Sequence, residues 1–288
     1  MKDIRHDFCA YLHHDLKRGI GRRWVYFLVA AILSALVCGQ LCQHHHQLMT
    51  AGDLAQVYGV EPTLSLGDYW CYLFQGTKIY VPGDPDFQVN IWWVIMQVYL
   101  AFTVALFPFQ DLAGYGQQLL LRARKRTLWW ISKCVWLAAS VAAFYIAIML
   151  TILVFGFLSG AALTLKPHAG VQAFFSNVDA GRVTGGFWLN AILLPLVTSL
   201  SLSFIQMALS LLTRPLIGLF MVTVILSGSI FYYSHWLLGN YLMLMRISLT
   251  GGIGVQPIYG FILGFSLILG SVAAGTAIIH KKDIIGNE

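Results

Sequence analysis

Long stretches without a single charged residue constrain this chain more than any other feature of its sequence. Three examples are Cys134–Leu165, Val183–Thr213 and Ile247–Ile279. Only 10% of the 288 residues are charged, whereas soluble domains carry about 25%. Because this chain has too few polar side chains to cover a water-soluble globule of its size, we expect it to fold in the hydrocarbon of a membrane.

Six apolar stretches are long enough to cross a membrane as helices, since roughly 20 residues rising ~1.5 Å each span the ~30 Å hydrocarbon. Helices satisfy every backbone polar group internally, as hydrocarbon requires. We therefore expect an all-α, polytopic integral membrane protein with six transmembrane helices, and a single domain over residues 1–288. The expected spans are Trp24–Cys42, Ile91–Phe109, Trp130–Phe157, Phe187–Leu212, Leu216–Tyr232 and Ile258–Ile279.

Lysine and arginine are distributed unequally between the connections. Fourteen of the 18 lie on one side of the expected membrane, counting Lys133 with the connection between the second and third spans. The opposite side holds Lys78, Lys166, Arg182 and Arg246. The positive-inside rule then predicts that both termini are cytoplasmic, in a multi-pass protein of the bacterial inner membrane.

The net charge of +6 is compatible with two kinds of negatively charged partner, nucleic acid or a membrane surface. The basic residues lie beside the apolar segments, which favours a membrane surface over nucleic acid. Residues 1–23 are a polar lead without the pattern of a cleavable signal peptide, so the first apolar segment is expected to stay as an anchor.

Two connections on the expected outer side have features of their own. Residues 43–90 are long for a connection in a helical bundle and predict a small outer cap, with an interfacial helix in Gly67–Val81. Residues 233–256 are semi-apolar but interrupted by Gly239 and Asn240. This interruption predicts an outer re-entrant segment before the last helix rather than a seventh span.

Cysteines and histidines near the outer side allow two kinds of cross-link. Cys38, Cys42 and Cys71 can include one disulfide, and the sequence leaves that question open. The triplet His44–His46 contains potential metal ligands. Because consecutive side chains point in different directions, we interpret the triplet as an exposed interfacial cluster.

Two segments outside the spans have amphipathic helical patterns. Residues 111–126 read DLAGYGQQLLLRARKR, with leucines and Tyr115 on one face, arginines and glutamines on the other, and Asp111 placed to cap the start. From periodicity alone, an ordinary basic loop helix explains residues 111–126 better than a partner-binding helix does. Residues 1–23 carry apolar side chains at helical spacing among basic ones. These apolar positions are Ile4, Phe8, Leu12 and Leu16.

The order of these elements resembles the type-2 permeases of ATP-binding-cassette (ABC) exporters. The resemblance covers most of the chain: an amphipathic lead, six spans, GYGQQLLLRARKRTLWWISK after the second span and LLGNYLMLMR before the last. It implies that residues 1–23 are a cytoplasmic connecting helix and residues 111–126 a coupling helix in a groove of a separate ATPase. The residues implied to contact that ATPase are Leu112, Tyr115, Gln118, Leu119, Arg122 and Arg124.

The chain has no motif for energy conversion or catalysis. GxxxxGK[ST], HExxH and GxSxG are all missing, so we expect no catalytic residue, no metal and no cofactor in this chain. If the resemblance holds, ATP and Mg²⁺ bind to the partner ATPase. The other implied partners are membrane lipids and a second permease subunit, either another copy of this chain or a related one.

Polar residues inside the expected spans are candidates for a transport pathway. We take Gln97, Thr223 and Ser227 as the possible pathway residues. Hydroxyl groups in helices usually bond to their own backbone, which is the simpler interpretation of Thr223 and Ser227. The sparse polar content favours an amphipathic or lipid-like cargo, and with the resemblance to exporters it implies an amphipathic peptide, a drug or a lipid-like molecule. Two alternatives stay open: a non-transporting membrane partner of an ATPase, serving sensing or resistance, and a secondary transporter.

Overall fold

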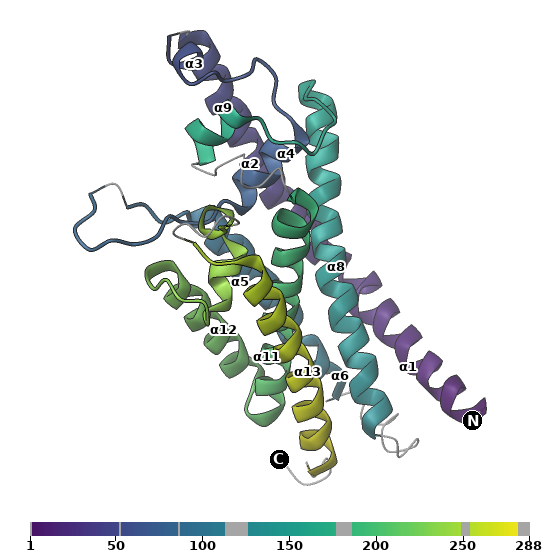
Figure 1. The fold of residues 1–288 in the computed structure, drawn as a ribbon. Helices are drawn as coiled ribbons and strands as arrows, with labels where there is room; N and C mark the ends of the chain where they lie inside the picture. The colour runs from purple at the N-terminus through teal and green to yellow at the C-terminus, as the bar shows by residue number, and fades with distance from the viewer. Residues whose placement is uncertain are drawn as a thin grey trace.

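The computed structural model describes residues 2–51, 53–85, 87–112, 126–176, 186–248 and 254–281. Helices dominate this part of the chain, and its β-type pairing is limited to the isolated bridges Ser65–Ala162 and Ile247–Val255. The all-α expectation is therefore confirmed for the described residues (Figure 1).

The α-helices are α1 (Lys2–Gly19), α2 (Trp24–Ala51), α3 (Asp53–Val57), α4 (Leu66–Phe74), α5 (Ile91–Ala105), α6 (Phe107–Leu112), α8 (Arg126–Ser159), α9 (Ala169–Val171), α11 (Leu194–Leu212), α12 (Pro215–Phe231) and α13 (Pro257–Lys281). Short 3₁₀ turns are η1 (Gly21–Arg23), η4 (Leu238–Leu242) and η5 (Leu244–Arg246), and short π-helical turns are η2 (Gln172–Ser176) and η3 (Trp188–Leu193).

Five helical stretches among the described residues are long and apolar enough to cross a membrane. They make the chain a multi-pass membrane protein, as expected from its composition. The remaining expected span, Leu216–Tyr232, corresponds to α12, which is apolar but has only 17 residues. The five stretches are Phe8–Ala51, Ile91–Asp111, Arg126–Ser159, Trp188–Leu212 and Pro257–Lys281.

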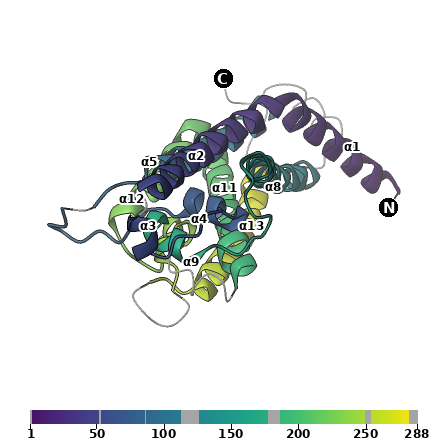
Figure 2. The same ribbon diagram turned by 90° about the horizontal axis from the view of Figure 1, so that it is seen from above.

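Helix α11 lies in the middle of the bundle and packs against α5, α8, α12 and α13 (Figure 2). Its contact with α13 is close because α13 presents glycines there. A Cβ atom on Gly264 would lie 2.9 Å from Val197 Cγ1, and one on Gly260 would lie 2.8 Å from Leu194 Cδ1. The GxxxG spacing of this pair therefore serves helix packing within the chain.

The outer cap differs from the expectation in two respects. Helix α2 continues past Cys42 to Ala51, so part of residues 43–90 belongs to the first long helix. The expected interfacial helix in Gly67–Val81 is wrong, because α4 is buried. Trp70 Nε1 donates to Ala191 O at 2.7 Å, and the Phe74 ring stacks on Tyr145, so protein covers this helix rather than lipid headgroups.

The amino end of α1 and the carboxyl end of α13 lie at the same end of the bundle, with α6 and the start of α8 (Figure 1). Helices α3, α4 and α9 lie at the opposite end. The segment before α13 contains the 3₁₀ turns η4 and η5, and the buried residues of η4 pack on α11 and α12.

Candidate functional site

A buried ion-pair cluster joins three helices near the end of the bundle where α1 begins. Lys133 of α8 has no exposed surface, and its Nζ lies 2.5 Å from Asp15 Oδ1 and 2.6 Å from Asp111 Oδ2. Asp15 belongs to α1 and is 2% exposed, and Asp111 belongs to α6 and is 5% exposed. One ammonium group thus binds two helices that are far apart in the sequence.

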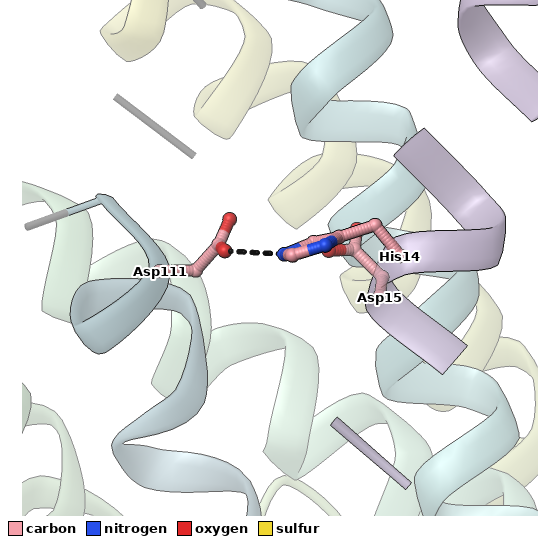
Figure 3. A group of neighbouring side chains, drawn as sticks. All are labelled: His14, Asp15 and Asp111. Carbon is pink, nitrogen blue, oxygen red and sulfur yellow. Dashed lines mark hydrogen bonds and ion pairs between the residues drawn. The ribbon is translucent and has the colours of Figure 1, made fainter. Parts of the chain in front are cut away.

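Neighbouring side chains complete the hydrogen bonding of this cluster. Ser132 Oγ donates to Asp15 Oδ2 at 2.6 Å, and His14 Nε2 lies 3.1 Å from Asp111 Oδ1 (Figure 3). The Lys133 ammonium also lies over the rings of Phe107 and Trp129, at 4.9 and 5.3 Å from their centres. These contacts offset the cost of removing three charged groups from water.

The residues in Figure 3 also have the composition of a metal site. Ligand atoms of His14, Asp15 and Asp111 lie within 4.8 Å of one another. However, the Lys133 ammonium already contacts an oxygen of each carboxylate, so a metal cation would have to displace it or be repelled by it. The arrangement therefore fits an ion-pair cluster better than a metal centre.

The flanks of residues 113–125 are attached to other helices as well. Arg23 Nη2 donates to Gln110 Oε1, next to Asp111. On the other side, Arg126 Nη1 donates to His280 O at 3.2 Å, and Thr127 Oγ1 lies 2.9 Å from His280 Nε2. The chain is therefore bound to α1 and η1 just before these residues and to α13 just after them.

The expected coupling helix falls largely on residues 113–125, which lie outside the described residues. Leu112 ends α6, and Asp111 is buried in the ion-pair cluster. The remaining candidates Tyr115, Gln118, Leu119, Arg122 and Arg124 all belong to the part that is not described.

Helix α1 forms as expected, but a different face of it is buried. Tyr11, Asp15 and Gly19 are buried, whereas Leu12 and Leu16 are only partly covered. Gly19 permits the contact with α8, because a Cβ atom there would lie 2.1 Å from Trp136 Nε1. The expectation from apolar spacing missed this face because its central residue is charged.

The assignment of Lys133 to a basic connection is also wrong. Helix α8 already begins at Arg126, so Lys133 lies inside the helix and is fully buried. The signal available in the sequence is its position within the apolar segment Trp130–Phe157. An ionisable residue in such a segment is rarely without a partner.

The candidate pathway residues do not lie together. Gln97 is 6% exposed and lines a small cavity with Gln206, whose Nε2 donates to Ala101 O at 2.9 Å. Thr223 Oγ1 instead donates to Leu219 O of its own helix at 2.9 Å. Ser227 is exposed on α12.

Arg246, in the LLGNYLMLMR stretch, is a second buried cation and is 1% exposed. Burial lowers the pKa of Arg246 to about 10, so the guanidinium stays charged at neutral pH. Two of its acceptors are carbonyl groups of the last turn of α12, which have no partner within that helix. The five acceptors are the carbonyl oxygens of Thr77, Lys78, Ser229 and Ile230 and the side-chain oxygen of Asn240.

The cysteines and histidines expected on the outer side do not form a shared site in the described part of the chain. Cys38, Cys42 and Cys71 are free thiols in the structure. His44 and His46 are exposed, but His45 is 7% exposed and its Nε2 lies 2.9 Å from Glu61 O. The expected exposed cluster is therefore wrong for His45, whereas the different directions of the three rings agree with the expectation.

Comparison with known proteins gives one match. The family described as "Protein of unknown function (DUF2705)" matches residues 82–285, which include α5, α8, α11, α12 and α13. No curated protein and no solved structure matches the chain.

Proposed function

The chain belongs to the DUF2705 family, and we propose that it is the membrane-spanning subunit of an ABC-type exporter whose ATPase is a separate polypeptide. The observation that carries this proposal is the buried Asp15–Lys133–Asp111 cluster. It connects α1, α6 and α8 directly beside residues 113–125, which the sequence pattern predicts to be a surface helix.

The cluster supports mechanical coupling because it resists separation of its partners. Pulling Asp111 away from Lys133 leaves a charge in a buried site without its partner, which costs several kcal/mol. A displacement of residues 113–125 is therefore transmitted to α6, α8 and α1 together. The contacts of Arg126 and Thr127 with His280 extend this transmission to α13.

In the proposed arrangement the chain crosses the bacterial inner membrane six times, with α12 as the short fifth span and both termini in the cytoplasm. Residues 1–23 form the connecting helix, residues 111–126 the coupling helix, and residues 233–256 an outer re-entrant segment. The distribution of Lys and Arg supports this orientation. Placing the start of α1 and the end of α13 at one end of the bundle agrees with an even number of crossings.

In the proposed complex, ATP and Mg²⁺ bind to the ATPase, and this chain contributes the translocation pathway with a second permease subunit. That subunit is either another copy or a related chain. The ATPase contacts are Leu112, Tyr115, Gln118, Leu119, Arg122 and Arg124. The cargo class is an amphipathic peptide, a drug or a lipid-like molecule, in keeping with the largely apolar helices.

Co-expression with a cognate ABC ATPase polypeptide tests the proposal. The wild-type pair is expected to copurify and to hydrolyse ATP. A variant combining Leu119→Asp, Arg122→Glu and Arg124→Glu should lose most of the hydrolysis that depends on the membrane subunit. This variant interrupts the apolar face of the coupling helix at Leu119 and reverses the positive charges at Arg122 and Arg124.

The matched control is Leu212→Asp with Arg214→Glu, which places the same kinds of substitution at the exposed last residue of α11 and in the connection to α12. It should leave assembly and hydrolysis close to the wild-type values. If the triple variant assembles and hydrolyses ATP like the wild type, the coupling assignment is wrong. Assembly and hydrolysis without any ATP-dependent transport would favour the non-transporting partner.

A further inference from the structure

A polar cavity lies at the opposite end of α5 from the ion-pair cluster. It has a volume of about 680 Å³ and lies between α2, the loop after α4, the start of α5 and the η2 turn. Asn90 at its edge and Asp111 in the cluster are separated by α5 and α6, which is roughly 30 Å at ~1.5 Å per residue.

Two side chains lining this cavity carry buried polar atoms without a hydrogen-bond partner in the described part of the chain. They are Gln40 Oε1 and Ser176 Oγ, and Ser176 is only 1% exposed. A buried polar atom without a partner costs free energy, so each of these side chains gains a hydrogen bond if it turns toward a polar occupant of the cavity. The cavity far exceeds the ~30 Å³ share of one water and falls within the ~300–1,000 Å³ typical of small-molecule sites.

The other lining groups limit the chemistry of the occupant. Lys78 is the one charged side chain among the described residues that line the cavity, and its Nζ already lies 2.8 Å from Asp84 Oδ2. The site therefore offers little net charge for an anion, and the unpartnered Gln40 oxygen favours an occupant with several hydrogen-bond donors. Further carboxamides, Gln75, Gln88 and Asn90, line the same cavity.

Aromatic rings lie among these carboxamides, from Tyr72 and Trp92 as well as Phe175. Ring faces pack against C–H groups, while carboxamides and hydroxyls both donate to and accept from hydroxyl groups. From this combination we propose that the cavity binds a neutral, polyhydroxylated ligand with the chemistry of a sugar. The inference goes beyond the proposed function and needs no ATPase partner.

Binding is tested on the full chain in lipid nanodiscs prepared without sugar-containing detergents. Radiolabelled maltose is the probe in equilibrium dialysis, and inorganic phosphate is tested in parallel. Maltose is expected to bind saturably at one site per chain, and phosphate is not. Nanodiscs containing diglucosyl diacylglycerol distinguish the two sources of the ligand, because a lipid-borne headgroup in the cavity would block maltose while a free-sugar site would stay open.

Variants connect the binding to this cavity. Gln40→Leu and Ser176→Ala should each weaken maltose binding about 2- to 10-fold, the effect of losing one hydrogen bond. Gln47→Leu makes the same substitution at an exposed residue of the same helix and should leave affinity unchanged. Gln88→Leu, at an exposed position on the rim, tests the cavity even if the buried variants do not fold.

Three results would each overturn the proposal. The first is that neither maltose nor the diglucosyl lipid binds, which leaves the cavity filled with water. The second is saturable binding of phosphate in place of sugar. The third is maltose affinity that Gln40→Leu and Gln88→Leu leave at the wild-type value, because the sugar would then bind elsewhere.

Discussion

At the scale of single residues, the fully buried ammonium group of Lys133 depends on nearby counterions. Its ammonium contacts Asp15 and Asp111, and all three groups are at most 5% exposed. Replacing Lys133 by Met would leave two carboxylates facing each other without a counterion. We expect Lys133→Met to lower the free energy of unfolding by about 3 to 5 kcal/mol, measured by denaturant titration in micelles.

The control for this substitution is Lys281→Met, since Lys281 is exposed at the end of α13. It should change stability little, because an exposed charge in water has almost no burial cost to offset. The triple variant Lys133→Met, Asp15→Asn, Asp111→Asn should recover part of the loss by removing the unpaired charges. Lys133→Met as stable as Lys281→Met would contradict the role assigned to the cluster.

The members of this cluster could be recognised in the sequence one by one, but their association could not. Asp111 and Lys133 border apolar segments, where ionisable residues are unusual. Asp15 is 118 positions from Lys133, and no local pattern relates them. The pairing depends on α1 packing along α8, which in turn requires the absence of a side chain at Gly19.

At the scale of elements, the contact between α11 and α13 depends on backbone closeness. A leucine at Gly264 would have to displace Val197, because even its Cβ atom would lie 2.9 Å from Val197 Cγ1. We expect Gly264→Leu to destabilise the protein by about 1 to 3 kcal/mol through overpacking. The measurement is the same denaturant titration, followed by circular dichroism.

Gly270 provides a matched control on the same helix, because a Cβ atom there would meet nothing within 4 Å. Gly270→Leu should leave stability unchanged or raise it by less than about 1 kcal/mol, since leucine favours a helix more than glycine does. Equal losses at both positions would mean that the cost comes from the helix itself and not from packing on α11.

Apolar length predicted which segments become long helices but not where those helices end. The stretch Trp24–Cys42 ends where polar residues begin, whereas α2 continues through His44–His46 to Ala51. Hydrophobicity reports the thickness of the hydrocarbon, and a helix can extend beyond it as long as its backbone bonds continue. Helix α4 shows the reverse case: its aromatic residues looked interfacial in the sequence, but the α2, α8 and η2 contacts bury them.

At the scale of the whole molecule, the number of crossings depends on α12. Its 17 residues reach only about 26 Å at ~1.5 Å per residue, slightly less than the ~30 Å hydrocarbon. Thr213 and His235 lie just beyond its two ends, and both are exposed. If α12 spans the membrane, these two residues must lie on opposite sides of it.

Single-cysteine variants at Thr213, His235 and Lys281, made on a Cys9→Ser background, measure this directly because the other four native cysteines are buried or half-buried. In intact cells a membrane-impermeant thiol reagent should label His235→Cys but not Thr213→Cys or Lys281→Cys. This pattern follows from six crossings with cytoplasmic termini.

Labelling of both His235→Cys and Lys281→Cys, with Thr213→Cys protected, would still place α12 across the membrane but would put the end of α13 outside. Equal labelling of Thr213→Cys and His235→Cys would reduce the crossings to five, and the two ends of the chain would then face opposite compartments. A single soluble motor could not then reach both residues 1–23 and the end of α13, and coupling would have to act through residues 113–125 alone.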